Sequence, residues 1–103
     1  MTEQERSAVL GLARLSVEAA VRGESPPSVP ESSILRGEGG AFVTLKIKGM
    51  LRGCIGHFNG IGSLGETVRA MAREASLGDP RFMPVQPDEL EEITVEVSVL
   101  SPM

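Results

Sequence analysis

The sequence contains no tryptophan and no tyrosine, and it has one cysteine and one histidine. A single cysteine excludes an internal disulfide bond. One cysteine and one histidine cannot fill a tetrahedral zinc site, which takes three or four protein ligands, so a metal would also need Asp79, Glu66 or a partner subunit. We therefore predict no structural metal site, and the sequence identifies no cofactor.

Long apolar runs and basic clusters are also missing. The apolar stretches fall far short of the roughly 20 residues that a bilayer-spanning helix needs, and the N-terminus lacks the basic and apolar regions of a secretory signal. The ten basic residues are scattered through a chain of net charge −4, which disfavours nucleic-acid binding. We expect a cytoplasmic protein that binds neither membranes nor nucleic acid.

Two segments have helical periodicity. Thr2 and Glu5 have the spacing of a capping box, and the apolar stripe after them predicts a helix over residues 3–22 that ends at Gly23. The same spacing at Ser63 and Glu66 opens a second helix, which Gly78 closes. Its apolar stripe has the spacing of one helix face and consists of Leu64, Val68, Met71, Ala72 and Ala75.

Three segments alternate apolar and polar residues as strands do: 41–47, 50–58 and 93–99. Gly49 marks a tight turn between the first two, and the Pro- and Gly-rich stretch 23–40 predicts a surface loop. At 103 residues the chain is one domain. We predict an α+β fold with a mainly antiparallel sheet flanked by helices, in the order helix, strand, strand, helix, strand.

The second strand carries the run Leu51-Arg52-Gly53-Cys54-Ile55-Gly56, followed at once by His57. Strand alternation predicts that Leu51 and Ile55 share one face, and that Arg52, Cys54 and Gly56 share the other. Arg52 would then lie roughly 6.7 Å from Cys54 and could stabilise a nucleophilic or redox-active thiolate. The alternative is a buried cysteine that fills space between glycines.

Cys54 and His57 could also form a catalytic pair. Their odd separation sends the two side chains to opposite faces of a regular strand, so a pair would need a bulge, which Gly56 could supply. Otherwise His57 caps the strand end or lies in a loop.

An anion is the ligand that the arginines favour. Arg52 and Arg81 could hold a carboxylate or phosphate if the fold brings them together. The alternatives are solvated or structurally paired arginines, and an Asp79 that only caps backbone donors in its turn. Gly53 and Gly56 match neither the dinucleotide nor the Walker phosphate-binding pattern.

The hexapeptide Leu51–Gly56 resembles the hallmark motif of the AMMECR-type domain family. Supporting matches follow in the same order along the chain: Phe42-Val43-Thr44-Leu45, Asp79-Pro80-Arg81-Phe82 and Glu96-Val97-Ser98-Val99-Leu100-Ser101-Pro102. The resemblance implies an α+β fold and a functional surface at Arg52, Gly53, Cys54 and Gly56, with Asp79 and Arg81 next. It supplies no established reaction.

The resemblance also bears on partners and on length. Prokaryotic relatives are associated with a Memo-type dioxygenase-like protein and a radical SAM protein, which implies a shared pathway. Family domains continue beyond the last strand, so residues 1–103 resemble an N-terminal portion of the domain. A strand edge left exposed by that truncation would promote formation of a homo-oligomer.

Two functions follow from these patterns. The first is an enzyme or small-ligand-binding protein that uses Cys54 as nucleophile or contact residue, with Arg52 holding an anionic group and His57 as a further catalytic candidate. The second is a non-catalytic adaptor that recruits Memo-type and radical SAM proteins, because one cysteine and one histidine leave little machinery for a multistep reaction. The arginine beside the cysteine favours the first.

Overall fold

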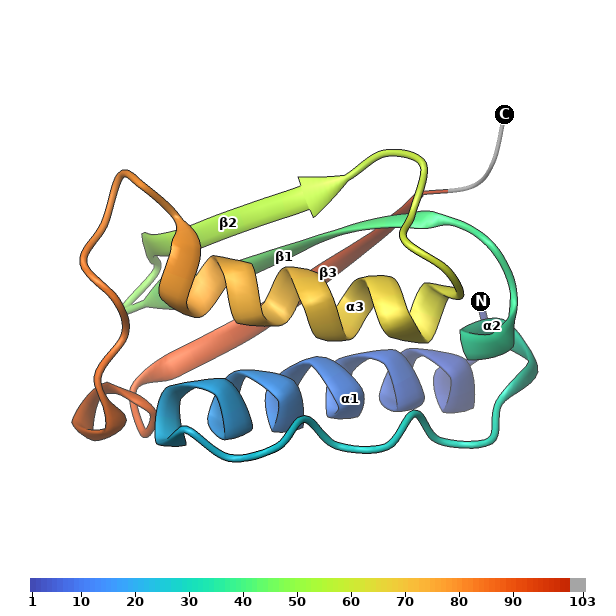
Figure 1. The fold of residues 1–103 in the computed structure, drawn as a ribbon, viewed down its shortest axis with the longest axis horizontal. Coiled ribbons are helices and arrows are strands. Elements are labelled where there is room, and N and C mark those ends of the chain that lie inside the picture. The colour runs from blue at the N-terminus through green and yellow to red at the C-terminus, as the bar shows by residue number, and fades with distance from the viewer. Residues whose placement is uncertain (101–103) are drawn as a thin grey trace.

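The structure of the chain is a computed structural model that describes residues 1–100. Its helices are α1 (Glu3–Arg22), a short α2 (Ser33–Arg36) and α3 (Leu64–Arg73), and its strands are β1 (Gly40–Ile47), β2 (Met50–His57) and β3 (Ile93–Leu100). A π-helical turn, Glu74–Gly78, continues α3, and a 3₁₀ turn, Pro87–Glu89, precedes β3. The predicted α+β class and element order are confirmed (Figure 1).

Both long helices begin at the predicted capping boxes. The Thr2 hydroxyl accepts a hydrogen bond from the backbone N–H of Glu5, whose carboxylate accepts from the backbone N–H of Thr2. Ser63 and Glu66 repeat this exchange at the start of α3. Each box satisfies backbone donors that have no partner within the helix. At the other end of α1, Gly23 adopts the left-handed conformation, with φ of 71°, and ends the helix.

The three strands form an antiparallel sheet in the order β2-β1-β3. Lys48 and Gly49 connect β1 to β2, and their φ angles of 53° and 78° are those of a two-residue type I′ hairpin turn. α1 and α3 lie side by side over one face of the sheet (Figure 1). Buried side chains of both helices pack on that face, against a row of apolar strand residues that includes Ala41, Val43, Leu45 and Ile55. We call the uncovered face, which carries Phe42, Thr44, Cys54 and Gly56, the open face.

A β-bulge in β2 corrects one expectation about the motif. Cys54 lies opposite Thr44 and Gly53 lies opposite Leu45, but the next residue of β1, Lys46, lies opposite Leu51. Arg52 is therefore an extra residue with no partner on β1, and every β2 residue before it changes face. The prediction that Leu51 shares a face with Ile55, and Arg52 with Cys54, is wrong because it assumed an unbroken alternation.

Two other segments are more structured than their composition indicated. The predicted loop 23–40 contains the single-turn helix α2, whose Leu35 is fully buried. The second predicted helix keeps its α-helical hydrogen bonding only to Arg73 and then widens into the π-helical turn. Ser101 and Pro102, which complete the last family match, lie outside the described residues. No helix in residues 1–100 is both long enough and apolar enough to cross a membrane.

Candidate functional site

The two glycines of the motif allow close approaches from opposite sides of β2. A Cβ atom at Gly53 would overlap the backbone carbonyl oxygen of Ala75 in the π-helical turn. A Cβ atom at Gly56 would overlap the ring of Phe42, which lies over that glycine on the open face. Both positions need glycine for packing. Gly53 lets the π-helical turn contact β2, and Gly56 lets the Phe42 ring cover β2.

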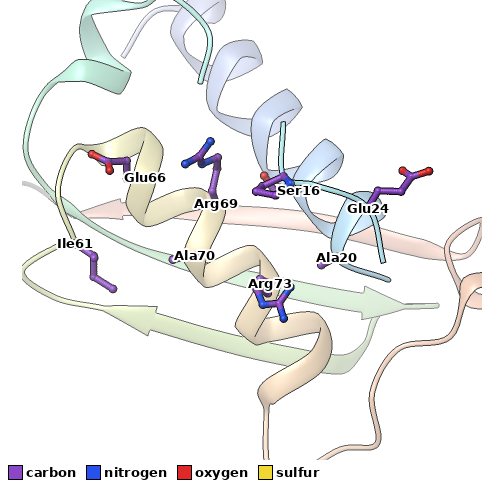
Figure 2. Close-up of a pocket in the computed structure, with 9 residues that line it drawn as sticks. Ser16, Ala20, Glu24, Ile61, Glu66, Arg69, Ala70 and Arg73 are labelled. Atoms are coloured by element: carbon purple, nitrogen blue, oxygen red, sulfur yellow. The ribbon is translucent and has the colours of Figure 1, made fainter. Parts of the chain in front are cut away.

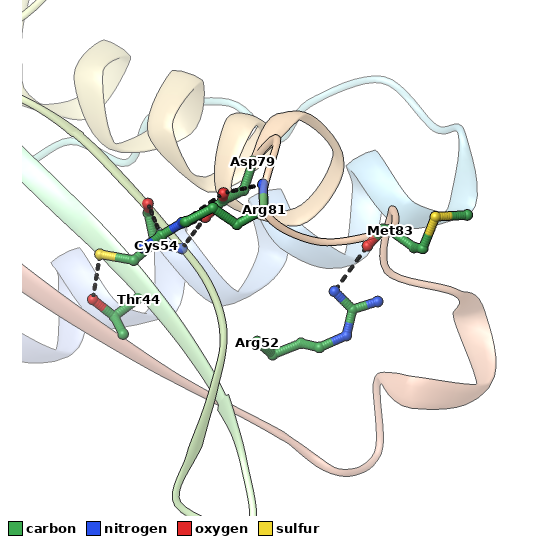
Figure 3. A network of polar contacts seen from close by, with 6 residues as sticks. All are labelled: Thr44, Arg52, Cys54, Asp79, Arg81 and Met83. Atoms are coloured by element: carbon green, nitrogen blue, oxygen red, sulfur yellow. Dashed lines mark hydrogen bonds and ion pairs between the residues drawn. The ribbon is translucent and has the colours of Figure 1, made fainter.

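Asp79 and Arg81 bind the backbone of Cys54 on the outer edge of the sheet. The Cys54 N–H donates to Asp79 Oδ2 at 3.0 Å, and the Cys54 carbonyl accepts from Arg81 Nη2 at 3.2 Å. The two side chains also bind each other, because Arg81 donates to Asp79 through Nη2 at 2.7 Å and through Nε at 3.0 Å. We call this arrangement the Asp79–Arg81 clasp (Figure 3). It occupies the hydrogen-bonding positions of a neighbouring strand.

Electrostatics favour the ionised form of the clasp. The hydrogen bond from Arg81 and those from the backbone N–H groups of Cys54 and Arg81 hold the pKa of Asp79 well below its usual range, against the opposing effect of its burial. Asp79 in turn raises the pKa of the Arg81 guanidinium. The Asp79 side chain is only 2% exposed whereas that of Arg81 is 55% exposed, so the carboxylate is the fixed member of the pair.

Arg52 is bound to the segment before β3 and does not face Cys54. Its guanidinium donates to both carboxylate oxygens of Glu89, at 2.8 and 3.0 Å, and to the carbonyl oxygens of Met83 and Pro84. The pKa of Glu89 is lowered, chiefly by Arg52. Since the bulge places Arg52 beside residues 83–89, these hydrogen bonds anchor that segment to β2. The arginine that donates to Cys54 is Arg81 (Figure 3).

The Cys54 side chain points to the open face. Its Sγ lies 3.2 Å from the Thr44 hydroxyl oxygen across the β1–β2 pair, and the residue is partly exposed. His57 is exposed and lies opposite Ala41, on the other side of the sheet from Thr44 and Cys54, because the register is regular from Cys54 to His57. Gly56 therefore supplies no bulge, and Cys54 and His57 do not form a pair.

Two residues of this region were missed by the sequence interpretation. Glu89 is the carboxylate partner of Arg52, and Thr44 is the hydroxyl partner of Cys54. Thr44 could have been found from the hairpin, since a two-residue turn places residue 44 near residue 54. No local signal joins Glu89 to Arg52. Within residues 1–100, no group of three or more His, Cys, Asp or Glu side chains is arranged to hold a metal ion.

Large apolar side chains are exposed along and beside β2. Met83 is 80% exposed, Phe58 75% and Met50 74%, and Leu51 is also exposed. Phe58 packs edge-on against Phe42 with 5.3 Å between ring centres. We call Met50, Leu51, Phe58 and Met83 the β2 flank. Exposed apolar groups gathered on one strand and its neighbouring loop are typical of a contact surface for another molecule.

A groove of about 290 Å³ lies away from the motif, between α1 and α3 (Figure 2). Ala20 and Ala70 form part of its wall, and Arg69 and Arg73 project from α3 beside them. Arg69 donates to the carbonyl oxygen of Pro27 and thereby ties the loop after α1 to α3. None of the sequence-predicted site residues lines this groove.

Comparison with known proteins bears directly on this arrangement. The sequence model of the AMMECR1 family matches residues 10–103. The chain belongs to the AMMECR1 family. The AMMECR1 resemblance inferred from the hexapeptide is thus confirmed over most of the chain. A protein of Methanothermobacter thermautotrophicus is 40% identical over 104 residues, covering 99% of this chain, and a protein of Thermotoga maritima is 49% identical over 81 residues, covering 77%.

The AMMECR1 fold is also present in a solved structure. The crystal structure of an uncharacterized protein from Pyrococcus horikoshii matches 99% of this chain with a TM-score of 0.89 and 33% sequence identity. The matches cover 54% of that chain, 54% of the Methanothermobacter protein and 46% of the Thermotoga protein. The chain therefore spans about half the length of these AMMECR1 relatives.

Proposed function

We propose that this AMMECR1-family chain is a cytoplasmic, non-catalytic protein-binding domain whose contact surface is the β2 flank. The observation that carries the proposal is the exposure of Met50 and Met83, each about three-quarters or more exposed, at one end of a strand whose outer edge is bound by the Asp79–Arg81 clasp. Methionine side chains are unbranched and polarizable, and they adapt to apolar surfaces of a partner.

The two arginines near the motif already bind groups of the protein itself, which favours a protein-binding role over a reaction that needs them to hold a substrate anion. Arg52 makes four hydrogen bonds to Glu89, Met83 and Pro84, and Arg81 is bound to Asp79 and to the backbone of Cys54. An arginine that is already paired with a carboxylate would have to break those contacts to hold a substrate anion. These residues fix the shape of the β2 flank.

The Memo-type and radical SAM proteins implied by the family resemblance are the partners we propose. The test measures binding of each purified protein to the unmodified chain and to the variants Met50→Ser and Met83→Ser by titration calorimetry. We expect each substitution to weaken binding by about fivefold or more, since truncating an apolar anchor at an interface costs more than about 1 kcal/mol.

The matched control is Leu15→Ser. Leu15 is 55% exposed on α1, which packs against α3 and β3 and lies away from β2, so its truncation should leave binding unchanged. Equal effects of the three substitutions, or no binding of either protein to the unmodified chain, would contradict the proposal.

Thiol chemistry at Cys54 is a second candidate, favoured by the partly exposed Sγ beside the Thr44 hydroxyl. The test is the rate of Cys54 alkylation against pH, in buffer and in denaturant. A rate that stays high in buffer at pH values where a free thiol is protonated, and that follows the free-thiol profile in denaturant, would support a reactive site. Protection in buffer with ordinary reactivity in denaturant would indicate a structural thiol.

A further inference from the structure

The groove between α1 and α3, which we call the α1–α3 groove, combines apolar and basic side chains (Figure 2). Its apolar lining comes from both helices and from the loops that follow α1 and β2: Ala20, Pro26, Ile61 and Ala70. All the residues that line it lie between positions 16 and 73, so the walls of the groove are complete within the described residues. Its volume of about 290 Å³ is close to the lower end of small-molecule sites, roughly 300 to 1,000 Å³.

Two arginines of α3 give this groove its positive charge. Arg69 and Arg73 are four residues apart, which places their side chains next to each other on one face of the helix. Arg69 donates one N–H to the carbonyl oxygen of Pro27, and this bond holds its guanidinium at the groove. The side chain of Arg73 has no hydrogen-bond or ion-pair partner within residues 1–100. Like charges at this spacing disfavour a helix slightly, and an anion bound between them would offset that cost.

Two glutamates also line the groove and limit the charge that it accepts. The Glu66 carboxylate is already engaged, because it accepts a hydrogen bond from the backbone N–H of Ser63 in the capping box of α3. Glu24 lies just beyond the C-terminal end of α1 and is exposed. Two arginines and two glutamates leave the lining without net charge, which favours a ligand with one negative charge over a polyanion.

We propose that the α1–α3 groove binds a small organic carboxylate with an apolar body. The carboxylate accepts hydrogen bonds from Arg69 and Arg73, since the planar guanidinium group matches the geometry of a carboxylate. The apolar body packs on Ala20 and Ala70, whose small side chains leave room for it. This site goes beyond the proposed function and is independent of it, because no residue of the β2 flank lines the groove.

The test titrates naphthylacetate into the isotope-labelled chain and follows the backbone amide shifts by NMR. Naphthylacetamide is the matched probe, since it keeps the apolar body and the shape of the carboxylate but carries no charge. We expect naphthylacetate to shift the amides of Ala20, Ala70 and Arg73 saturably, and to bind on the order of tenfold more tightly than the amide.

Two substitutions of equal charge change test the role of the arginine. Arg73→Gln should remove most of the difference in affinity between the two probes. Arg36→Gln should keep that difference, because the Arg36 side chain is 64% exposed on α2 and does not line the groove. A difference that survives Arg73→Gln, or equal affinities of the two probes for the unmodified chain, would overturn the proposal.

A third variant tests the apolar part of the site. Ala20→Leu keeps both arginines, suits a helix and fills the space beside Ala70, so it should abolish the saturable shifts. Circular dichroism checks that each variant keeps the fold. Binding that a folded Ala20→Leu leaves unchanged, or shifts confined to the β2 flank, would place the probe elsewhere on the chain and overturn the proposal. The absence of any saturable shift would overturn it as well.

Discussion

Replacing Asp79 by asparagine removes charge from the clasp with little change in shape. The Asp79 carboxylate accepts four hydrogen bonds: from the backbone N–H of Cys54, and from the backbone N–H, Nε and Nη2 of Arg81. A carboxamide has one accepting oxygen, and its NH₂ group would face donors in place of the other oxygen. At least one backbone N–H therefore loses its acceptor.

The magnitude follows from the hydrogen bonds that are lost. A hydrogen bond to a charged group contributes about 1.5 to 3 kcal/mol, and the Arg81 side chain, which is 55% exposed, can turn to water at little cost. We expect Asp79→Asn to lower the free energy of unfolding by about 2 to 3 kcal/mol at pH 7, which corresponds to a fall in Tm of roughly 10 to 15 °C for a domain of this size.

The pH dependence gives a second arm to this experiment. Because the pKa of Asp79 is depressed in the folded state, its ionised form adds stability above the unfolded-state pKa of about 3.9. That contribution is lost as the pH falls through the lower, folded-state value. The unmodified chain should therefore lose more stability than Asp79→Asn between about pH 5 and pH 2, and the two should converge.

Urea unfolding followed by circular dichroism suits this chain, which has neither tryptophan nor tyrosine to report by fluorescence. Asp88→Asn is the matched control, since Asp88 is exposed in the 3₁₀ turn and should show neither effect. A loss below about 0.5 kcal/mol for Asp79→Asn at pH 7, or a loss that is the same at pH 5 and pH 2, would refute the reasoning.

Two further predictions concern packing and the arginine anchor. Gly53→Ala should destabilise the chain by at least about 2 kcal/mol in urea unfolding, because its Cβ overlaps the Ala75 carbonyl, whereas Gly11→Ala, which has open space in α1, should stabilise it by about 0.5 to 1 kcal/mol. Equal effects would contradict the packing argument. Arg52→Lys should cost about 1 to 2 kcal/mol in the same assay, because an ammonium group cannot reproduce the two-pronged contact with Glu89; an unchanged unfolding midpoint would show that this anchor is dispensable.

Local patterns were sufficient to predict the starts of the two long helices and the positions of the three strands. The capping boxes at Thr2 and Ser63 set both helix starts, and the alternation of β1 and the Lys48-Gly49 turn set the hairpin. The bulge at Arg52 could not be predicted from alternation, because the sequence of β2 does not show which of its residues lacks a partner on β1. Its cause is tertiary: Arg52 reaches carbonyl groups and a carboxylate more than 30 residues away, as in its pairing with Glu89 at a separation of 37.

The same limit applies to the candidate site. The sequence pointed to Asp79 and Arg81 through the family resemblance, but their contact with Cys54 joins residues 25 and 27 apart in the chain. No periodicity reports which edge of a sheet such residues will reach. The π-helical turn was also not predicted; it brings the Ala75 carbonyl against Gly53 of a distant strand, and no local pattern reports such a contact.

The Asp79–Arg81 clasp binds main-chain atoms of Cys54, whereas the partner of its sulfur is the Thr44 hydroxyl. The anchoring of the strand and the identity of the side chain at this position are thus separate properties. A thiol-reactive spectroscopic probe at Cys54 would therefore be attached at one defined place, with the strand beneath it still held. The signal of such a probe would change when another molecule binds to the open face. Cys54 is the only cysteine of the sequence, so no second thiol would be labelled.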